Sequence, residues 1–367
     1  MSDPYAHIPF IPGLTLSTYF YQEAVAPLLH QHFPTLPYAA ARLGPGSDVL
    51  GFDTPRSRDH AWGPRLTLYL TPSAYDQYAA IIDKTLRQHL PPTCHGYPTN
   101  FSPSANSGER VMLPTTTPPI NHLITITTIE NFFHNYLRYN ITTPLTLAHW
   151  LTFPQQSLRT IASGRIFHDD FGTLTQLRHQ LNYYPHDLWL YLLAAQWRRI
   201  AQEEPFLGRT GHAGDDLGSR LLAARLTQEI MRLCFYFDKQ YIPYSKWFGT
   251  AFQKLTLAPQ LNPLFDQLWA APSWQQRETI INQAYQLVAQ THNNLNLGPP
   301  QPTTPTPFHD RPYLVIHAEN FSQTTYNAIT DPAVRALPPT LGSIDQFVDT
   351  TDILSYPDHF TLFRSLF

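Results

Sequence analysis

A turn of small residues, Gly-Pro-Gly-Ser at residues 44–47, separates two short apolar segments near the start of the chain. The apolar residues 38–43 precede it, and residues 65–70 alternate further along as a strand should. Gly46 has no Cβ and Ser47 offers a small hydroxyl donor, so backbone N–H groups in this turn can approach phosphate oxygens closely. The pattern predicts a phosphate-binding turn next to a strand.

Acidic residues follow this turn, and they are the candidate ligands for a metal ion beside the phosphates. Asp59 is the main candidate, because magnesium takes oxygen ligands and bridges to substrate phosphates. Asp48 and Asp53 are further candidates, although Asp53 could instead cap the turn that follows it. We therefore expect Asp59 to face the turn and to bind magnesium.

The turn and the acidic segment together resemble the nucleotidyltransferase superfamily, whose fold is shared by DNA polymerase beta and the antibiotic nucleotidyltransferases. They are most similar to a poorly characterised bacterial and fungal branch of unknown function, in which Gly-Ser is followed by Asp-His-Asp. Matching segments continue through most of residues 15–295, at Trp150-Leu151, 164–167, Tyr184-Pro185, 214–219 and 243–249.

This resemblance implies an α/β fold of the α+β type, in which a mixed-sheet domain carries a helical bundle that forms the far wall of the acceptor pocket. It also implies transfer of a nucleoside monophosphate from a nucleoside triphosphate to a hydroxyl or amine, with Mg²⁺ as cofactor and release of pyrophosphate. In that reaction Gly46 and Ser47 hold the phosphates and Asp59 is the catalytic metal ligand. The acceptor and the preferred base are not indicated by these residues.

One residue departs from the motif of the branch. Where the branch has Asp-His-Asp, this chain has Asp59, His60 and Ala61. In the superfamily both carboxylates bridge two magnesium ions, so the loss of one implies impaired metal binding and impaired in-line displacement. Three explanations stay open: catalysis has been abandoned, Asp48 or Asp53 substitutes, or Ala61 is an engineered change. A catalytically inactive nucleotide-binding or protein-interaction module is therefore the alternative to an enzyme.

A second departure concerns the strongest strand candidate, residues 122–129, which is dense in β-branched residues. In nucleotidyltransferases a strand in this region commonly offers a third carboxylate, which acts as base or completes the metal site. Here the positions opposite the apolar face of the strand are Thr125 and Thr127, and the nearest acid is Glu130, just after the strand. The resemblance makes Glu130 the candidate catalytic base that activates the acceptor.

Two cations in the second half of the chain are candidates for binding the nucleotide. Lys246 lies between aromatic residues, so its compact charge suits a triphosphate and the rings could stack on a base or sugar; core packing explains the rings equally well. Arg220 follows Asp215 and Asp216 by about one helical turn. It could hold phosphate while the carboxylates line the acceptor pocket, and helix capping explains the two acids equally well.

The charge, the histidine and cysteine content and the apolar runs of the sequence disfavour several kinds of partner and cofactor. The net charge is −3 without a dense Lys/Arg block, which disfavours a nucleic-acid partner. The 17 histidines and 2 cysteines form neither a zinc motif nor a disulfide framework. The chain shows no basic-then-apolar leader and no apolar run of the ~18 residues that a membrane span needs, so we expect a cytoplasmic protein. The oligomeric state is not indicated.

Hydrophobic periodicity divides the chain into three parts. Residues 1–150 form the predicted nucleotidyltransferase-like domain, with helices over 15–33 and 75–90 and a long Pro/Thr/Ser loop over 91–119. Residues 151–296 form a predicted helical domain, and residues 297–367 a Pro-rich linker with a C-terminal extension. Further elements are expected at 188–200, 217–241 and 273–293 as helices, the last capped by Ser273, and at 313–318 as a strand. The 35 prolines favour short elements and disfavour long coiled coils.

Overall fold

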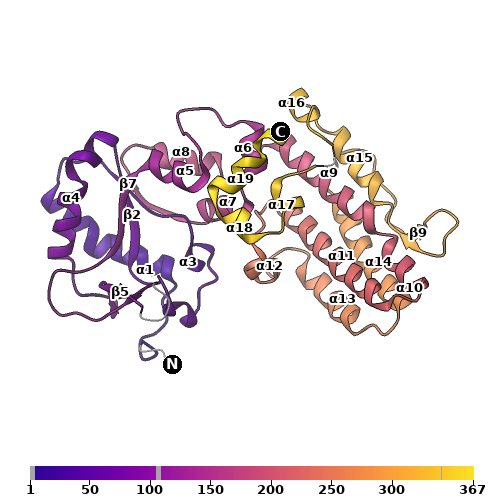
Figure 1. Cartoon of the computed structure of the whole chain (residues 1–367), viewed down its shortest axis with the longest axis horizontal. Helices are drawn as coiled ribbons and strands as arrows, with labels where there is room; N and C mark the ends of the chain where they lie inside the picture. Colours follow the sequence, from indigo (N-terminus) through magenta and orange to yellow (C-terminus); the bar gives the residue numbers. More distant parts are fainter. Residues whose placement is uncertain (1–4, 105–108, 340) are drawn as a thin grey trace. The chain divides into compact units, whose positions relative to one another are not determined.

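The computed structural model describes residues 5–104, 109–339 and 341–367, and the side chain of Asp59 lies outside the described residues. The chain divides into two compact units. The first comprises Met1–Pro144 and Ser157–Asn182, and the second comprises Leu145–Gln156 and Tyr183–Phe367. The fold is α+β, as the sequence predicts, because a sheet dominates the first unit and helices dominate the second (Figure 1).

A mixed four-stranded sheet, in the order β7-β2-β1-β8, forms the frame of the first unit. β1 (Ala39–Arg42) runs antiparallel to both of its neighbours, β2 (Arg65–Leu70) and β8 (Arg165–Asp169). β7 (Leu123–Thr128) runs parallel to β2. The strands predicted at residues 65–70 and 122–129 are confirmed, and the apolar residues 38–43 contain β1. β8 was not predicted, and it lies beyond residue 150, in a part of the chain that we expected to be helical.

Alternation along β2 gives this sheet an apolar face. Leu66, Leu68 and Leu70 are buried on it, together with Ile124 of β7. The helical segments that contribute to this core are α1 (Gly13–Phe20), η1 (Tyr21–Val25), α2 (Ala26–His32) and α4 (Pro72–His89). α4 begins at Pro72 because Thr71 caps it, accepting a hydrogen bond from the N–H of Ala74 at 3.3 Å. The two helices predicted for this region are confirmed.

The opposite face of the sheet is more polar. The residues that alternate onto it are Arg65, Thr67 and Tyr69 of β2, beside Leu123, Thr125 and Thr127 of β7. α5 (Ile129–Leu137) packs near this face, since the ring of Phe132 meets the ring of Tyr69 edge-on with centroids 5.6 Å apart. α5 begins directly after β7, where Thr128 accepts a hydrogen bond from the N–H of Asn131 at 3.0 Å. This polar face therefore leads straight into a capped helix.

The segment predicted as a long loop, residues 91–119, contains two short antiparallel ladders. β3 (Thr93–Cys94) pairs with β4 (Tyr97–Pro98), and β5 (Phe101–Pro103) pairs with β6 (Arg110–Met112). Tyr97, Phe101 and Met112 belong to the buried core. The described part of this segment is therefore folded onto the first unit, and its strands are too short to leave a periodic pattern in the sequence.

Short helices complete the first unit. α3 (Ser47–Leu50) and η2 (Pro55–Asp59) lie between β1 and β2 in the sequence, and α8 (Thr173–Gln180) follows β8. α7 (Gln155–Ala162) contains the point at which the chain passes from the second unit to the first. The connection from β1 to β2 therefore holds both the small-residue turn and the acidic segment.

The second unit is mainly helical in its described part. α9, α11 and α14 pack together, and α15 packs on α9, where the rings of Trp197 and Phe321 stack with centroids 4.5 Å apart (Figure 1). The bounds are α6 (Leu147–Thr152), α9 (His186–Glu203), α10 (Phe206–His212), α11 (Asp216–Phe237), α12 (Ser245–Phe252), α13 (Ala258–Ala270), α14 (Trp274–Asn293) and α15 (Ala318–Asn327). The three predicted helices are confirmed, and Ser273 caps α14 by accepting a hydrogen bond from the N–H of Gln276 at 3.3 Å.

The C-terminal extension belongs to the helical unit. The predicted strand is confirmed only in part: β10 (Leu314–Val315) pairs with β9 (Thr306–Pro307), and it is short because α15 already begins at Ala318. The remaining elements are α16 (Pro332–Arg335), α17 (Ile344–Phe347), α18 (Thr351–Ser355), α19 (Pro357–Phe360) and η3 (Thr361–Leu366). Among the described helices, none is long and apolar enough to cross a membrane.

The side chain of Glu204 binds the backbone of the C-terminal extension just before α15. Its carboxylate accepts hydrogen bonds from the N–H groups of Ile316 at 2.9 Å and Ala318 at 3.0 Å. Burial of the carboxyl outweighs these bonds and raises the pKa of Glu204 to about 7. The second unit thus buries an acid that is stabilised by backbone dipoles.

Candidate functional site

Asp48, directly after the small-residue turn, is the centre of a buried ionic cluster. Arg42 donates to its carboxylate from Nε to Oδ2 at 2.8 Å and from Nη2 to Oδ1 at 3.0 Å. Arg65 donates from Nη2 to the same Oδ1 at 2.7 Å. Burial alone would raise the pKa of Asp48, but the two guanidinium groups lower it to about 2. Asp48 is therefore ionised at neutral pH, and both of its oxygens are engaged.

This cluster contains two cations, Arg42 and Arg65, and one anion, Asp48. Of the two arginines, Arg65 has fewer hydrogen-bond acceptors. Arg42 is well satisfied, because its Nη1 also donates to the carbonyl oxygen of Leu43 at 2.9 Å and its Nη2 to that of Pro45 at 2.7 Å. Among the described residues, Arg65 makes one hydrogen bond, and its Nε is buried without an acceptor. Burial and the charge of Arg42 lower the pKa of Arg65 to about 10, so it stays protonated at neutral pH.

The turn needs glycine because its backbone lies against this cluster. Gly46 has a φ of +149°, and a Cβ at this position would overlap side-chain atoms of Asp48, Arg42 and Arg65. The next residue, Ser47, is half-buried, and its Oγ lies 3.5 Å from the Oγ of Ser57 in η2. The glycine therefore allows close approach to the arginines.

A cavity of about 410 Å³ lies beside the turn, the polar sheet face and α5. Its volume falls within the range of roughly 300–1,000 Å³ that is typical of small-molecule sites. Leu43 and Pro45 line it from the turn, whereas Gly46 and Ser47 are not among its described lining residues. The other lining residues are Arg42, Ala61, Arg65, Leu66, Thr67, Leu123, Thr125, Thr127, Phe132, Asn135 and Tyr136. The cavity thus combines guanidinium groups, hydroxyls and aromatic rings.

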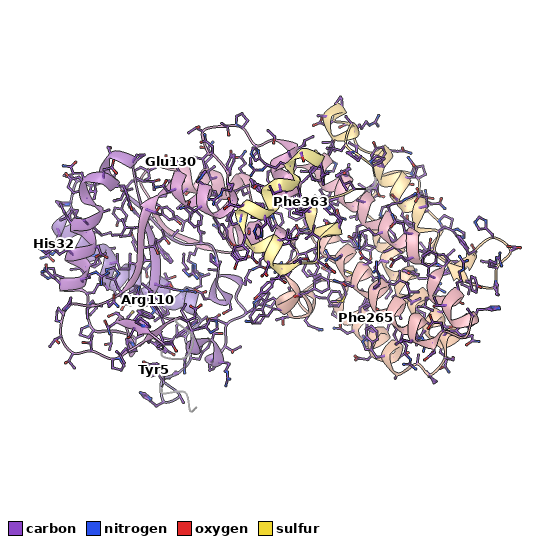
Figure 2. The ribbon with its side chains drawn as sticks, in the orientation of Figure 1. Tyr5, His32, Arg110, Glu130, Phe265 and Phe363 are labelled. Carbon is purple, nitrogen blue, oxygen red and sulfur yellow. The ribbon has the colours of Figure 1, made fainter. Side chains whose placement is uncertain are left out.

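Ala61, where the resemblance expects a second carboxylate, lies in the wall of this cavity. The N–H of Ala61 donates to the carbonyl oxygen of Arg110, a residue labelled in Figure 2, at 2.8 Å. The φ of Ala61 is +35°, in the left-handed region where Asp and Asn are enriched over other non-glycine residues. Asp59 is the last residue of η2, shortly before Ala61, but its side chain lies outside the described residues. Its role as a metal ligand stays a prediction.

Two threonines stand where the resemblance places a third carboxylate. Thr125 and Thr127 both line the cavity from β7. Thr125 pairs across the parallel ladder with Thr67, which also lines the cavity. The prediction that these threonines lie on the face opposite the apolar positions of the strand agrees with this arrangement, and they offer hydroxyls instead of a carboxylate.

Glu130, the predicted base, lies apart from these lining residues. It is exposed in the first turn of α5 (labelled in Figure 2). Successive helical residues are about 100° apart, so Glu130 lies on a different side of α5 from Phe132, Asn135 and Tyr136, which line the cavity. A negative charge is favourable at a helix N-terminus, which accounts for an acid at this position.

Asp53 links the acidic segment to the first helix. Its Oδ2 accepts a hydrogen bond from the N–H of Gly13 at 2.6 Å and from Nε1 of Trp62 at 2.9 Å. Capping of the following turn falls instead to Thr54 and Ser57, whose side chains form a capping box. Asp53 therefore stabilises the start of α1 and the approach to the cavity wall.

Lys246 and Arg220 belong to the second unit. Lys246 is exposed in the first turn of α12, with Nζ 5.1 Å from the centroid of the Trp247 ring. Arg220 donates from Nε to Oδ2 of Asp216 at 2.7 Å, and Asp216 also pairs with Arg277.

The acids before Arg220 have a structural role in α11. Asp215 is the N-cap of α11 and accepts a hydrogen bond from the N–H of Gly218 at 2.8 Å, so the capping explanation is confirmed for this residue. The hydrogen bond from Arg220 and the pairing with Arg277 lower the pKa of Asp216. Arg220 is thus engaged with its own helix, and a role in phosphate binding stays a prediction.

The described side chains do not fit a pair of magnesium ions. Both oxygens of Asp48 are engaged by arginines, and Asp53 is engaged by Gly13 and Trp62. Ala61 supplies no oxygen ligand from its side chain. Within the described part of the chain, no group of three His, Cys, Asp or Glu side chains is placed to hold a metal ion. The roles of Asp59, Asp48 and Asp53 as metal ligands stay predictions.

Sequence reasoning missed the two arginines, although the sequence contained a signal. Asp48 lies in an apolar stretch, Val-Leu-Gly-Phe, and a buried carboxylate requires a countercharge. Arg42 ends β1 and Arg65 begins β2. In an antiparallel pair the end of one strand lies near the start of the next, so the three charges could have been grouped.

Part of the chain matches a family of unknown function, and a solved structure is weakly similar to most of it. Residues 150–248 match a family described as a Domain of unknown function (DUF4037). No curated protein matches the chain. Among solved structures, a nucleotidyltransferase-like protein from Exiguobacterium sibiricum 255-15 is similar over 74% of this chain and 75% of that chain, at 12% sequence identity and a TM-score of 0.32.

Proposed function

We propose that the first unit is a nucleotidyltransferase-like module that binds a nucleoside triphosphate in the cavity, and that it has little or no transferase activity. The observation that supports this proposal is the composition of the cavity wall. Arg65 and the threonines of β2 and β7 offer donors for phosphate oxygens, and Phe132 with Tyr136 offers aromatic surface for a base. Ala61 stands in the same wall, where the motif expects a carboxylate.

We expect little transferase activity because nucleotidyl transfer needs metal ions that carboxylates hold. In-line displacement at a triphosphate is supported by two metal ions, which need carboxylates to bridge them. Ala61 cannot bridge a metal, and the carboxylate of Asp48 is neutralised by arginines instead of being offered to the cavity. A protein of this design retains the binding step and loses most of the transfer step.

A second candidate function is the transfer itself, from a nucleoside triphosphate to a hydroxyl or amine of an acceptor. One observation favours it: η2 ends at Asp59, close in sequence to Ala61 in the cavity wall. In this alternative Asp59 binds Mg²⁺, Glu130 acts as the base, and Lys246 and Arg220 bind phosphate.

Two measurements on the purified chain separate the candidates. Isothermal titration with each of the common nucleoside triphosphates measures binding, and a coupled assay measures pyrophosphate release with Mg²⁺. Binding without release supports the first proposal, and release at rates typical of enzymes supports the second. If none of the triphosphates binds and no pyrophosphate appears, both are wrong.

Ala61→Asp tests whether the site has otherwise been retained. The left-handed backbone at this position tolerates Asp well, so the change should not cost stability. We expect Ala61→Asp to raise Mg²⁺-dependent pyrophosphate release by about tenfold or more, because a second carboxylate restores a metal bridge. Ala61→Asn is the matched control, since it has the same shape without the charge. Equal release by both variants would contradict the argument.

A further inference from the structure

The cavity of the first unit carries an unbalanced positive charge, and this charge indicates how its ligand is held. We infer that the guanidinium of Arg65 binds the phosphate groups of the ligand directly, so that nucleotide binding needs no divalent metal ion. The inference rests on the proposed function, because it concerns how the same cavity holds a nucleoside triphosphate. In this arrangement the guanidinium of Arg65 takes the place of the magnesium ions that the resemblance implies.

The first argument is the charge of the cluster. Arg42 and Arg65 share a single carboxylate, Asp48, and Arg42 makes the more extensive contact with it. These three side chains have a net formal charge of about +1, while Asp53, which also acts electrostatically on Arg65, is already engaged by Gly13 and Trp62. A phosphate group in the cavity would supply the missing countercharge.

The second argument is the hydrogen-bonding capacity of Arg65. A guanidinium has five N–H donors. Arg65 uses one donor nitrogen, Nη2, on Asp48, and no other acceptor is present for it among the described residues. Its side chain is 17% exposed and lines the cavity, whereas Arg42 is almost completely buried and has acceptors in Asp48, Leu43 and Pro45. Arg65 is thus the arginine that is free to bind a ligand, and planar guanidinium groups suit phosphate.

The third argument is the set of hydroxyls that surround Arg65. Thr67 follows Arg65 on the same face of β2, and Thr125 pairs with Thr67 across the ladder. Thr127 continues the row along β7, and all three threonines line the cavity. Hydroxyl groups can donate to several phosphate oxygens at once. Together with Arg65 they form a site for an extended polyphosphate.

The same features oppose a divalent cation. A metal ion in the cavity would be repelled by the excess charge of the two guanidinium groups. None of the described residues that line the cavity carries a carboxylate. The side chain of Asp59 lies outside the described residues. Freeing Asp48 for a metal would require breaking its contacts with Arg42 and Arg65, which leaves two buried cations without a countercharge.

The first experiment compares metal-free and metal-containing binding. ATP is titrated into the full chain by calorimetry, once in excess EDTA and once in excess MgCl₂, with inorganic tripolyphosphate as a second probe. We expect ATP to bind in EDTA at least as tightly as in magnesium, and tripolyphosphate to bind in EDTA as well. Binding of ATP only in magnesium would overturn the inference and leave the proposed function intact. Absence of ATP binding in both conditions would overturn the proposed function and the inference with it.

The second experiment changes the donors. Arg65→Gln removes the charge, and we expect it to weaken ATP binding in EDTA by about tenfold or more, with Arg65→Lys intermediate. Arg87→Gln is the matched control, because Arg87 is on α4, pairs with Asp83 at 2.6 Å, and should leave the affinity unchanged.

A threonine variant keeps the test decisive if Arg65→Gln fails to fold. Thr125 is exposed, so Thr125→Val should fold normally, and it should weaken ATP binding in EDTA by about threefold or more through loss of its hydroxyl. A folded Arg65→Gln protein with the affinity of the original chain, or unchanged affinity in Thr125→Val, would show that phosphate is bound elsewhere.

Discussion

Two buried acids, Asp48 in the first unit and Glu204 in the second, are satisfied in opposite ways. In the first unit Asp48 lies between the guanidinium groups of Arg42 and Arg65, which lower its pKa to about 2. In the second unit Glu204 accepts hydrogen bonds from backbone N–H groups, and burial raises its pKa to about 7. Backbone dipoles satisfy the oxygens of an acid without supplying a countercharge, so desolvation dominates at Glu204. The comparison teaches that a buried acid keeps its charge where guanidinium groups surround it, as they surround Asp48 beside the cavity of the first unit.

Asp48→Asn should have the largest effect on stability. The amide keeps the shape of the side chain but leaves two buried guanidinium groups without a countercharge, which typically costs about 3–5 kcal/mol. Hydrogen exchange of β1 and β2 peptides should report this loss as lower protection. Asp53→Asn is the control, and it should cost only about 1 kcal/mol, because the amide oxygen can still accept from Gly13 and Trp62. Similar protection in the two variants would contradict the structural role of Asp48.

The pH dependence of local stability should have opposite signs in the two units. The folded pKa of Asp48 is lowered, so its contribution is present above about pH 4 and is lost as the pH falls toward 2. The folded pKa of Glu204 is raised, so the protonated acid is favoured and local stability falls as the pH rises from about 4.5 to 7. The second change should be on the order of 2–3 kcal/mol. Hydrogen exchange, corrected for intrinsic rates, can follow β1 and the start of α15 separately, and a common trend would contradict the comparison.

Glu204→Gln should have a smaller effect than the change at Asp48. Below pH 5 the buried carboxyl of Glu204 is protonated, and the side-chain amide resembles it in shape and in offering one strong acceptor oxygen, so we expect the free energy of unfolding to change by about 1 kcal/mol or less. The slope of stability between pH 4.5 and 7 should also become shallower, because no buried acid ionises at this position. An unchanged slope would assign the pH dependence to another group.

Lys246→Ala and Arg220→Ala should have the smallest effects. Both side chains are largely exposed, so their charges are screened by solvent and the fold should not change measurably. If they contribute to the triphosphate site, each loss should weaken ATP binding by about twofold to threefold in calorimetry. Lys254→Ala, another exposed lysine of the second unit, is the control. Affinities that match the control would remove both residues from the site.

Much of the frame was predictable because local patterns specify it. The alternation of β2 separates Leu66 and Leu68 from Arg65 and Thr67, and this period alone predicts an apolar face and a polar face. Ser273 and the apolar spacing after it predicted α14 in the same way. The threonines of β7 were also placed on the face opposite the apolar positions.

The rest depends on contacts between residues that are distant in the sequence. β8 pairs with β1 across more than a hundred residues, and nothing in its own sequence marks it as an edge strand. The ladders within 91–119 are formed by two or three residues each, several of them prolines, so periodicity cannot detect them. The contacts of Asp48 with Arg42 and Arg65 depend on the pairing of β1 with β2, which local sequence patterns do not specify.

β8 lies far from β1 in the sequence although the two strands pair, and this limits how the protein can be divided into fragments. A fragment that stops at residue 150 would leave one edge of β1 unpaired, and an open edge invites pairing with other chains. A fragment that starts there would carry an orphan strand, Arg165–Asp169, without its sheet. The stretch 150–248, which matches the family of unknown function, contains β8 without the other strands of its sheet. We therefore expect a fragment limited to this stretch to fold poorly when it is expressed alone.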